Sequence, residues 1–213
     1  MLSRSWCYFP LLCVMAAPSW AAAPAEAPAT RPGNGLARPE DQAFQQRLFG
    51  RVLLKSPIHA CFDRAYDAGH LAAHPSQKVR TMRLLVTGQN AGSDGGPTYD
   101  LAMRVTFRKN GTHFEASGFC GSIHDQMSPG EGGKVAHCGV ACDGGVINVS
   151  LKDQSSVLVA IPNGASTSSP QGENDGPRFG SDDKVFRLQR TALTNCSGLV
   201  EDADTRRAIR RGE

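Results

Sequence analysis

Four residues in the second half of this 213-residue chain could together bind a metal ion: His124, His137, Cys138 and Cys142. Imidazole nitrogen and thiolate sulfur are both ligands of zinc and copper. The separation of Cys138 from Cys142 differs from the Cys-x2-Cys spacing of common zinc sites, and no second pair of that spacing follows. A metal-binding or thiol-redox role is therefore one hypothesis, although the redox role lacks a Cys-x-x-Cys motif at the start of a helix.

Disulfide bonds are the other use that these cysteines could have. Two of the 7 cysteines, Cys7 and Cys13, fall in an N-terminal segment that we expect to be removed on export. The cysteines of an exported protein usually form disulfides, and an odd number leaves one thiol over. The sequence predicts that Cys61 pairs with Cys196 and that Cys120 pairs with Cys138 or Cys142. Under this hypothesis the five remaining cysteines are Cys61, Cys120, Cys138, Cys142 and Cys196.

One further motif could be catalytic or metal-binding, but a structural role is favoured for it, and the sequence lacks one common catalytic motif. His70 and His74 would share one face of a helix, as zinc-protease histidines do, but Leu71 stands where that motif needs a glutamate. No Gly-x-Ser-x-Gly motif is present to seat a serine nucleophile. We therefore favour a non-enzymatic role and expect no cofactor.

The elements that would position these residues are mostly strands. From Tyr99 to Phe107, apolar and polar residues alternate with the period of two that a half-buried strand has. Asn110-Gly111 follows, a strong signal for a tight hairpin turn, and the chain returns through 112–120. Similar patterns predict strands over 82–87, 147–151, 157–161 and 185–193. About seven strands indicate a mainly β fold, either a small antiparallel β-barrel or a sandwich, with a short N-terminal helical segment.

The chain divides into four predicted parts. Residues 1–25 have the features of a secretory signal peptide, and residues 26–39 form an Ala/Pro-rich tether that we expect to be disordered. Residues 40–198 form a single disulfide-stabilised β domain. This domain begins with a short amphipathic helix that is predicted over residues 40–55. Residues 199–213 are a charged tail that we expect to be flexible.

Charge and hydropathy narrow the choice of partners. A net charge of +3 gives no reason to expect nucleic-acid binding. We expect no transmembrane segment after signal cleavage, and a periplasmic or secreted location. The leading hypothesis is a barrel that binds an unknown protein or small ligand of the cell envelope, and the candidate binding loops are Gly88–Pro97 and Gly121–Gly133.

Three motifs carry a resemblance to a known group of proteins. They are Cys61-Phe-Asp-Arg-x-Tyr-Asp-x-x-His-Leu-x-x-His-Pro-x-Gln-x-Val79, His137-Cys-Gly-Val-x-Cys-Asp-Gly-Gly145 and Asp182-Asp-x-Val-Phe-Arg-Leu188. Over most of residues 58–198 the chain resembles uncharacterised small secreted proteins of Gram-negative bacteria, which implies a shared fold and supplies no activity. In size, export and disulfide use it is also similar to periplasmic barrels that inhibit lysozyme, a likeness of architecture that does not determine function.

Overall fold

The computed structural model describes residues 39–53, 56–90, 97–109, 111–128, 131–140, 144–169 and 176–212, without the side chains of 39–40, 121–128 and 131–135. The predicted signal peptide and nearly all of the predicted tether lie outside the described residues. Every described residue belongs to one compact unit.

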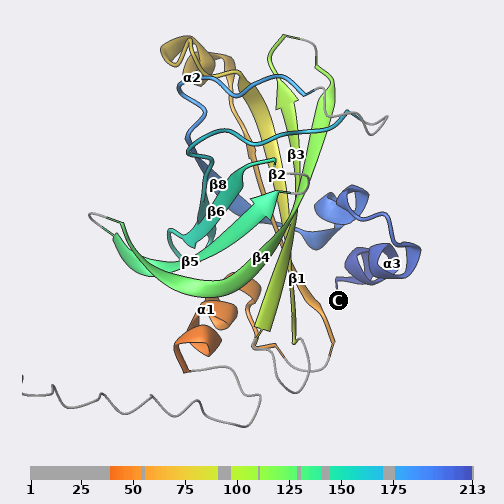
Figure 1. Ribbon diagram of the computed structural model, residues 1–213. Helices are drawn as coiled ribbons and strands as arrows, with labels where there is room; N and C mark the ends of the chain where they lie inside the picture. Colours follow the sequence, from red (N-terminus) through yellow and green to blue (C-terminus); the bar gives the residue numbers. More distant parts are fainter. Residues whose placement is uncertain are drawn as a thin grey trace, which may run out of the picture. The chain divides into compact units, whose positions relative to one another are not determined.

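The described strands form one closed antiparallel barrel (Figure 1). Each strand pairs with the next one along the chain, and the last pairs with the first. The barrel confirms the predicted mainly β class and decides between the barrel and the sandwich. Its strands are β1 (Ile58–Ala65), β2 (Val79–Asn90), β3 (Pro97–Phe107), β4 (His113–Ser128), β5 (Glu131–Val140), β6 (Val146–Leu151), β7 (Ser156–Ala160) and β8 (Val185–Thr191).

The predicted hairpin of β3 and β4 is confirmed, and its alternating residues fill the barrel interior. Every second residue of β3 from Tyr99 to Phe107 is buried, and Tyr99 lies opposite Cys120 on β4. Gly111 has a φ of 64°, as the turn requires. An eight-stranded barrel has an interior just wide enough for side chains to fill, so this one is a packed core.

Helix α1 (Pro39–Phe49) closes one end of the barrel, and the short helix α2 (Ala68–Ala73) lies at the other end (Figure 1). Phe44 and Leu48 of α1 are buried in the same core as the strands. Gln45 is fully buried; its Nε2 donates to the Tyr99 hydroxyl at 3.1 Å, and its Oε1 accepts from the Leu53 backbone N–H at 3.0 Å. Burial raises the pKa of Tyr99 to about 12, so the phenol stays protonated as a hydrogen-bonding group. The predicted packing of this helix on the barrel is confirmed.

Strand β1 was not predicted from the sequence because it is buried on both faces. Its first five residues, Ile58 to Phe62, are all buried, so they do not alternate in polarity. Ile58, Ala60 and Phe62 belong to the barrel core, whereas Cys61 belongs to a second, smaller core outside the barrel wall.

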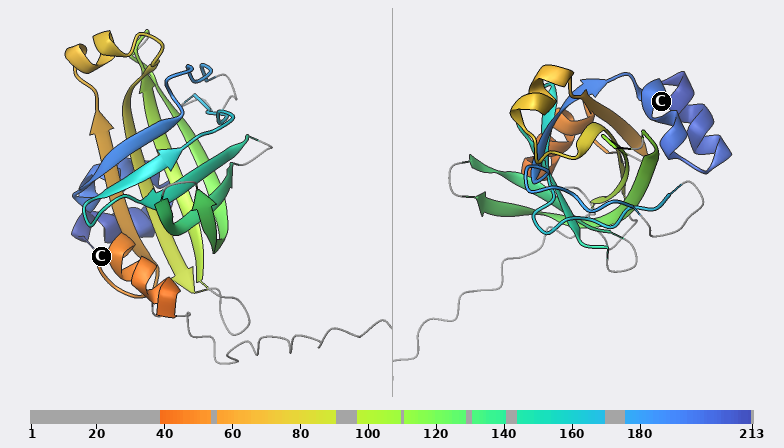
Figure 2. Two further views of the ribbon diagram at one scale, coloured as in Figure 1. Left: turned by 90° about the vertical axis from the view of Figure 1, so that its left-hand side faces the viewer. Right: turned by 90° about the horizontal axis from the view of Figure 1, so that it is seen from above.

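The C-terminal segment forms this second core and differs from the flexible tail expected for 199–213. A 3-10 helix, η1 (Leu193–Leu199), and helix α3 (Ala203–Arg211) lie against the outer wall (Figure 2). Ile209 is fully buried, and the Asp202 carboxylate caps α3 by accepting from the Thr205 N–H. The charges that suggested a solvated tail occupy the exposed face of α3, while a single isoleucine anchors its other face.

The two predicted binding loops are also revised. Residues 121–133, expected as a loop, continue strands β4 and β5, whose pairing extends to Ser128 and Glu131. The alternation signal fails there because polar residues and glycines fill this ribbon. In the 88–97 loop, β2 extends to Asn90 and β3 begins at Pro97, and residues 91–96 lie outside the described part of the chain.

The described residues form two disulfide bonds. Cys61 is bonded to Cys196, as predicted, and joins β1 to η1. Cys120 is bonded to Cys138, one of the two predicted partners, and joins β4 to β5 within the barrel core.

Removing the Cys61–Cys196 bond should destabilise the fold more than removing the Cys120–Cys138 bond. The sequence separations of the two pairs are 135 and 18 residues. On the chain-entropy model these bonds contribute about 5 and about 3 kcal/mol to the free energy of unfolding. Urea unfolding of the Cys61→Ala/Cys196→Ala and Cys120→Ala/Cys138→Ala variants, followed by circular dichroism, measures both losses. Equal losses, or the reverse order, would contradict this account.

Replacing Tyr99 by phenylalanine should lower the free energy of unfolding by about 1–3 kcal/mol, because the buried Gln45 amide loses its acceptor. Tyr66→Phe is the matched control, since the Tyr66 hydroxyl bonds to no other residue that the structure describes. Its effect should be within about 0.5 kcal/mol. Chemical denaturation of both variants makes the comparison, and equal losses would show that the hydrogen bond to Gln45 is unimportant.

Candidate functional site

The outer faces of β1 to β4 carry side chains in parallel rows, because opposite residues of paired strands point to the same side. We number these rows from the α1 end of the barrel. The first row is His59, Thr87, Asp100 and Phe119; the second is Cys61, Leu85, Ala102 and Ser117; the third is Asp63, Arg83, Arg104 and Glu115; and the fourth is Ala65, Thr81, Thr106 and His113.

The η1–α3 segment packs on the second row over β1 to β3. Cys196 and Ile209 pack with Cys61 and Leu85, and Ala102 borders the same cluster. The first row and the third row therefore lie on opposite sides of the segment. Each side holds a depression with different chemistry.

The larger depression, the α3 cleft, lies over the first row and has a volume of about 950 Å³. Three separate parts of the chain meet there: the connection from α1 into β1, the end of β2, and one face of α3. The lining residues are Arg51, Val52, Ser56, Pro57, Ile58, His59, Thr87, Gln89, Asp204, Thr205 and Ala208.

His59 and Thr87 form a buried polar pair in this cleft. The His59 side chain is only 8% exposed, and its Nδ1 lies 3.0 Å from Thr87 Oγ1. Burial, followed by the positive charge of Arg51, lowers the pKa of His59. The imidazole is therefore neutral at pH 7, with one nitrogen that accepts and one that donates.

Charged groups stand at the edge of the cleft and apolar groups form its walls. Arg51 is exposed, and Asp204 forms an ion pair with Arg207 on the next turn of α3. Val52 and Ala208 supply apolar surface. A molecule with an apolar body and a few polar atoms fits this combination of surfaces.

The His59–Thr87 pair does not form a hydrolytic triad with the described residues. A triad needs a third group that orients the imidazole, and Thr87 is the one described residue that hydrogen bonds with His59. The arrangement is suited to holding a ligand through uncharged hydrogen bonds.

Cys138, one of the four residues predicted to bind a metal, forms a disulfide bond and is not a free thiolate. His137 and Cys138 are consecutive residues of β5, and consecutive strand residues point to opposite faces of the sheet. Cys138 points into the core and is bonded to Cys120, so its thiolate is not available to a metal. His124 lies on β4 without a described side chain, and Cys142 lies outside the described residues. Within the described part, no group of three or more His, Cys, Asp or Glu residues could hold a metal.

His70 and His74 have the structural role that the sequence favoured. Their rings stack on α2 with centroids 4.5 Å apart, and the His70 ring also stacks on Tyr66 at 4.5 Å. His70 Nε2 lies 3.0 Å from Gln77 Oε1, which ties the helix to the start of β2.

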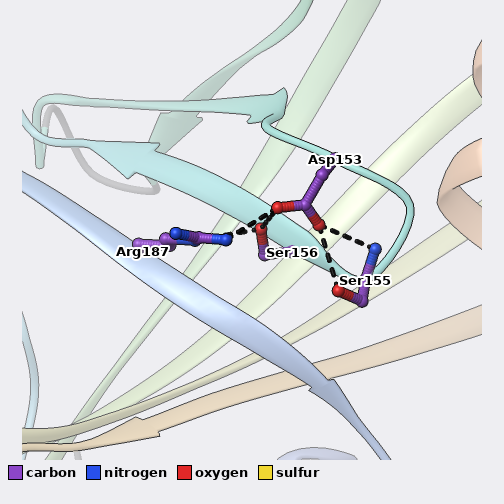
Figure 3. Close-up of polar contacts among 4 residues, drawn as sticks. All are labelled: Asp153, Ser155, Ser156 and Arg187. Atoms are coloured by element: carbon purple, nitrogen blue, oxygen red, sulfur yellow. Dashed lines mark hydrogen bonds and ion pairs between the residues drawn. The ribbon is translucent and has the colours of Figure 1, made fainter.

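A polar cluster at the turn between β6 and β7 is also structural (Figure 3). The Asp153 carboxylate accepts from the Ser156 hydroxyl at 2.7 Å, from the Ser155 N–H at 2.9 Å and from Arg187 at 2.7 Å. These hydrogen bonds, with Arg187 as a smaller contribution, hold the pKa of Asp153 well below its usual range. The cluster fastens the turn to β8 and contributes no cavity.

Sequence reasoning missed the α3 cleft because its walls come from distant segments. Residues 51–59, 87–89 and 204–208 meet only when the C-terminal segment folds back onto β1 and β2. One signal was available: Ile58 to Phe62 reads apolar without alternation around Cys61, whose predicted partner Cys196 lies near the C-terminus. These two facts predict that the strand is covered on both faces and that the C-terminal segment covers its outer face.

Comparisons of this chain with protein-family models, with curated proteins and with solved structures found no match. None of the helices in the described part of the chain has the length and apolarity that crossing a membrane requires.

His59 should make the folded protein less stable in mild acid. The folded-state pKa of His59 lies below the ordinary value of 6.5, so the unfolded chain takes up a proton first as the pH falls through 6.5. Stability is thus lost below pH 6.5, until the pH reaches the folded-state pKa. In His59→Gln the glutamine still offers Thr87 a hydrogen-bond partner but does not titrate. As the pH is lowered from 7.5 to 5, the variant should therefore lose less stability than the native protein. Denaturant unfolding of both proteins at the two pH values measures their free energies of unfolding. An equal loss of stability in the variant and in the native protein would contradict the prediction.

Proposed function

We propose that this protein is an exported, non-enzymatic binding protein of the cell envelope whose α3 cleft holds a small organic ligand with an apolar body. The observation that carries the proposal is the cleft itself, with its volume of about 950 Å³, apolar walls and a neutral His59–Thr87 pair. Small-molecule sites are typically about 300–1,000 Å³ and combine apolar lining with a few well-placed polar groups.

Exposed apolar residues continue the first row beyond the cleft. Phe119 is 57% exposed, and Val146 is 41% exposed on β6. Gly139 lies between them in register, so no side chain separates the two. Strands lie about 4.8 Å apart, which places Phe119 about 10 Å from Thr87. An elongated apolar ligand would gain contact area along this row.

Export is part of the proposal and has indirect support. Two disulfide bonds are compatible with an oxidising compartment such as the periplasm. The N-terminal signal features and the resemblance to small secreted proteins of Gram-negative bacteria point the same way. The alternative, a metal-binding or thiol-redox protein, is weaker because Cys138 is occupied by its bond to Cys120.

Filling the α3 cleft should abolish binding of an amphipathic probe. Ala208 lines the cleft, whereas Ala203, on the same helix, is exposed and does not line it. Anilinonaphthalene sulfonate, which binds apolar surfaces, is a suitable probe. Ala208→Trp should weaken its binding by about tenfold or more, and Ala203→Trp should leave it unchanged, because only the first indole occupies the cleft.

Fluorescence titration measures both affinities, and circular dichroism confirms that both variants fold. A third variant, Phe119→Ser, tests whether the probe binds along the exposed row. Loss of binding in Phe119→Ser alone would move the site from the cleft to the open face and favour a protein partner. Equal binding by all variants would remove the proposed site.

A further inference from the structure

The third row of the barrel wall carries four charges in the order negative, positive, positive, negative. Asp63, Arg83, Arg104 and Glu115 are successive cross-strand neighbours from β1 to β4. At one flank Arg83 lies 3.8 Å from the Asp63 carboxylate, and at the other Arg104 Nε donates to Glu115 at 2.7 Å. Arg83 and Arg104 are therefore cross-strand neighbours in the middle of the row.

This central pair places two like charges on neighbouring strands, and each arginine has one carboxylate on its outer side. Like charges directly opposite each other on neighbouring strands destabilise a sheet. Arg104 Nη2 also donates to the Gly198 carbonyl at 2.7 Å and so positions η1. Arg83 makes only the long contact with Asp63, and its Nε is buried without an acceptor among the described residues. Arg83 thus retains unused donors next to a second positive charge.

The space beside the two arginines is a groove of about 340 Å³ that extends over the fourth row. Thr81, Thr106 and His113 line its floor, and Arg64 lines its rim. The Thr81, Thr106 and His113 side chains supply two hydroxyl groups and an imidazole, whereas the Arg64 guanidinium lies over the Tyr66 ring, 5.2 Å from its centroid. Among the described residues that line the groove, three are arginines and Asp63 is the one acid.

We propose that this groove, the arginine groove, binds a phosphate or sulfate group between Arg83 and Arg104. Guanidinium groups bind such oxyanions through paired, charge-assisted hydrogen bonds. The anion would relieve the repulsion between the two arginines and engage the unused donors of Arg83. The η1–α3 segment separates the arginine groove from the α3 cleft, so this site is independent of the proposed function.

The test compares Arg83→Gln with Arg210→Gln. Arg210 is exposed on α3 and does not line the groove, so its loss removes the same charge elsewhere. The readout is the melting temperature in a phosphate-free buffer and after addition of inorganic phosphate, with the ionic strength held constant by sodium chloride. Isothermal titration calorimetry gives the affinity for phosphate directly.

The native protein and Arg210→Gln should both gain melting temperature with phosphate, and Arg83→Gln should not. Without phosphate, Arg83→Gln should be as stable as the native protein or more stable, because the repulsion is gone. The affinity for phosphate should fall by about tenfold or more in Arg83→Gln. An equal response of all three proteins, or no response in any, would overturn the proposal.

A parallel arm identifies the source of the phosphate group. The native protein could sediment with phosphatidylglycerol vesicles but not with vesicles of phosphatidylcholine alone. If Arg83→Gln then fails to sediment with phosphatidylglycerol, the phosphate group belongs to a lipid surface. Phosphate binding without sedimentation would assign it to a soluble molecule. Sedimentation that Arg83→Gln retains would show a general charge effect and would count against the site.

Discussion

The bond between Cys61 and Cys196 holds the C-terminal segment against the outside of the barrel, and the α3 cleft depends on it. The bond attaches η1 to β1, and Ile209 completes the apolar contact that seats α3. Without this segment Cys61 and Leu85 of the second row would be exposed, and the α3 cleft would lose the wall that Asp204, Thr205 and Ala208 supply. One covalent link thus holds in place the helix that forms one wall of the α3 cleft.

The barrel interior, in contrast, is used for stability. Helix α1 closes one end with Phe44 and Leu48, and the buried Gln45–Tyr99 hydrogen bond satisfies the polar groups that this closure buries. The Cys120–Cys138 bond lies inside the same core. Many barrels of this size hold a ligand in the lumen. Here the described core residues occupy it, which directs recognition to the outer wall.

Sequence reasoning recovered the parts of the fold that obey local rules. The alternation of β3 and the turn at Gly111 follow from backbone geometry and were predictable, and so was the Cys61–Cys196 bond. Strand β1 was not, because burial on both faces removes the alternation that identifies a strand. The His137–Cys138 pair was misleading for a related reason: residues adjacent in a strand point in opposite directions. The α3 cleft could not be predicted, since His59, Gln89 and Ala208 meet only in the folded chain.

The closure of the barrel by β1 and β8 has a consequence for the export that we propose. A chain that is translocated from its N-terminus presents Cys61 first, and Cys120 and Cys138 emerge before Cys196 does. Barrel closure and the outer disulfide must therefore both await the last strand. During that interval Cys120 and Cys138 bond to each other across the β4–β5 hairpin, and neither is then available to bond with Cys61. The inner disulfide thus removes two of the thiols that could pair with Cys61 before Cys196 is present.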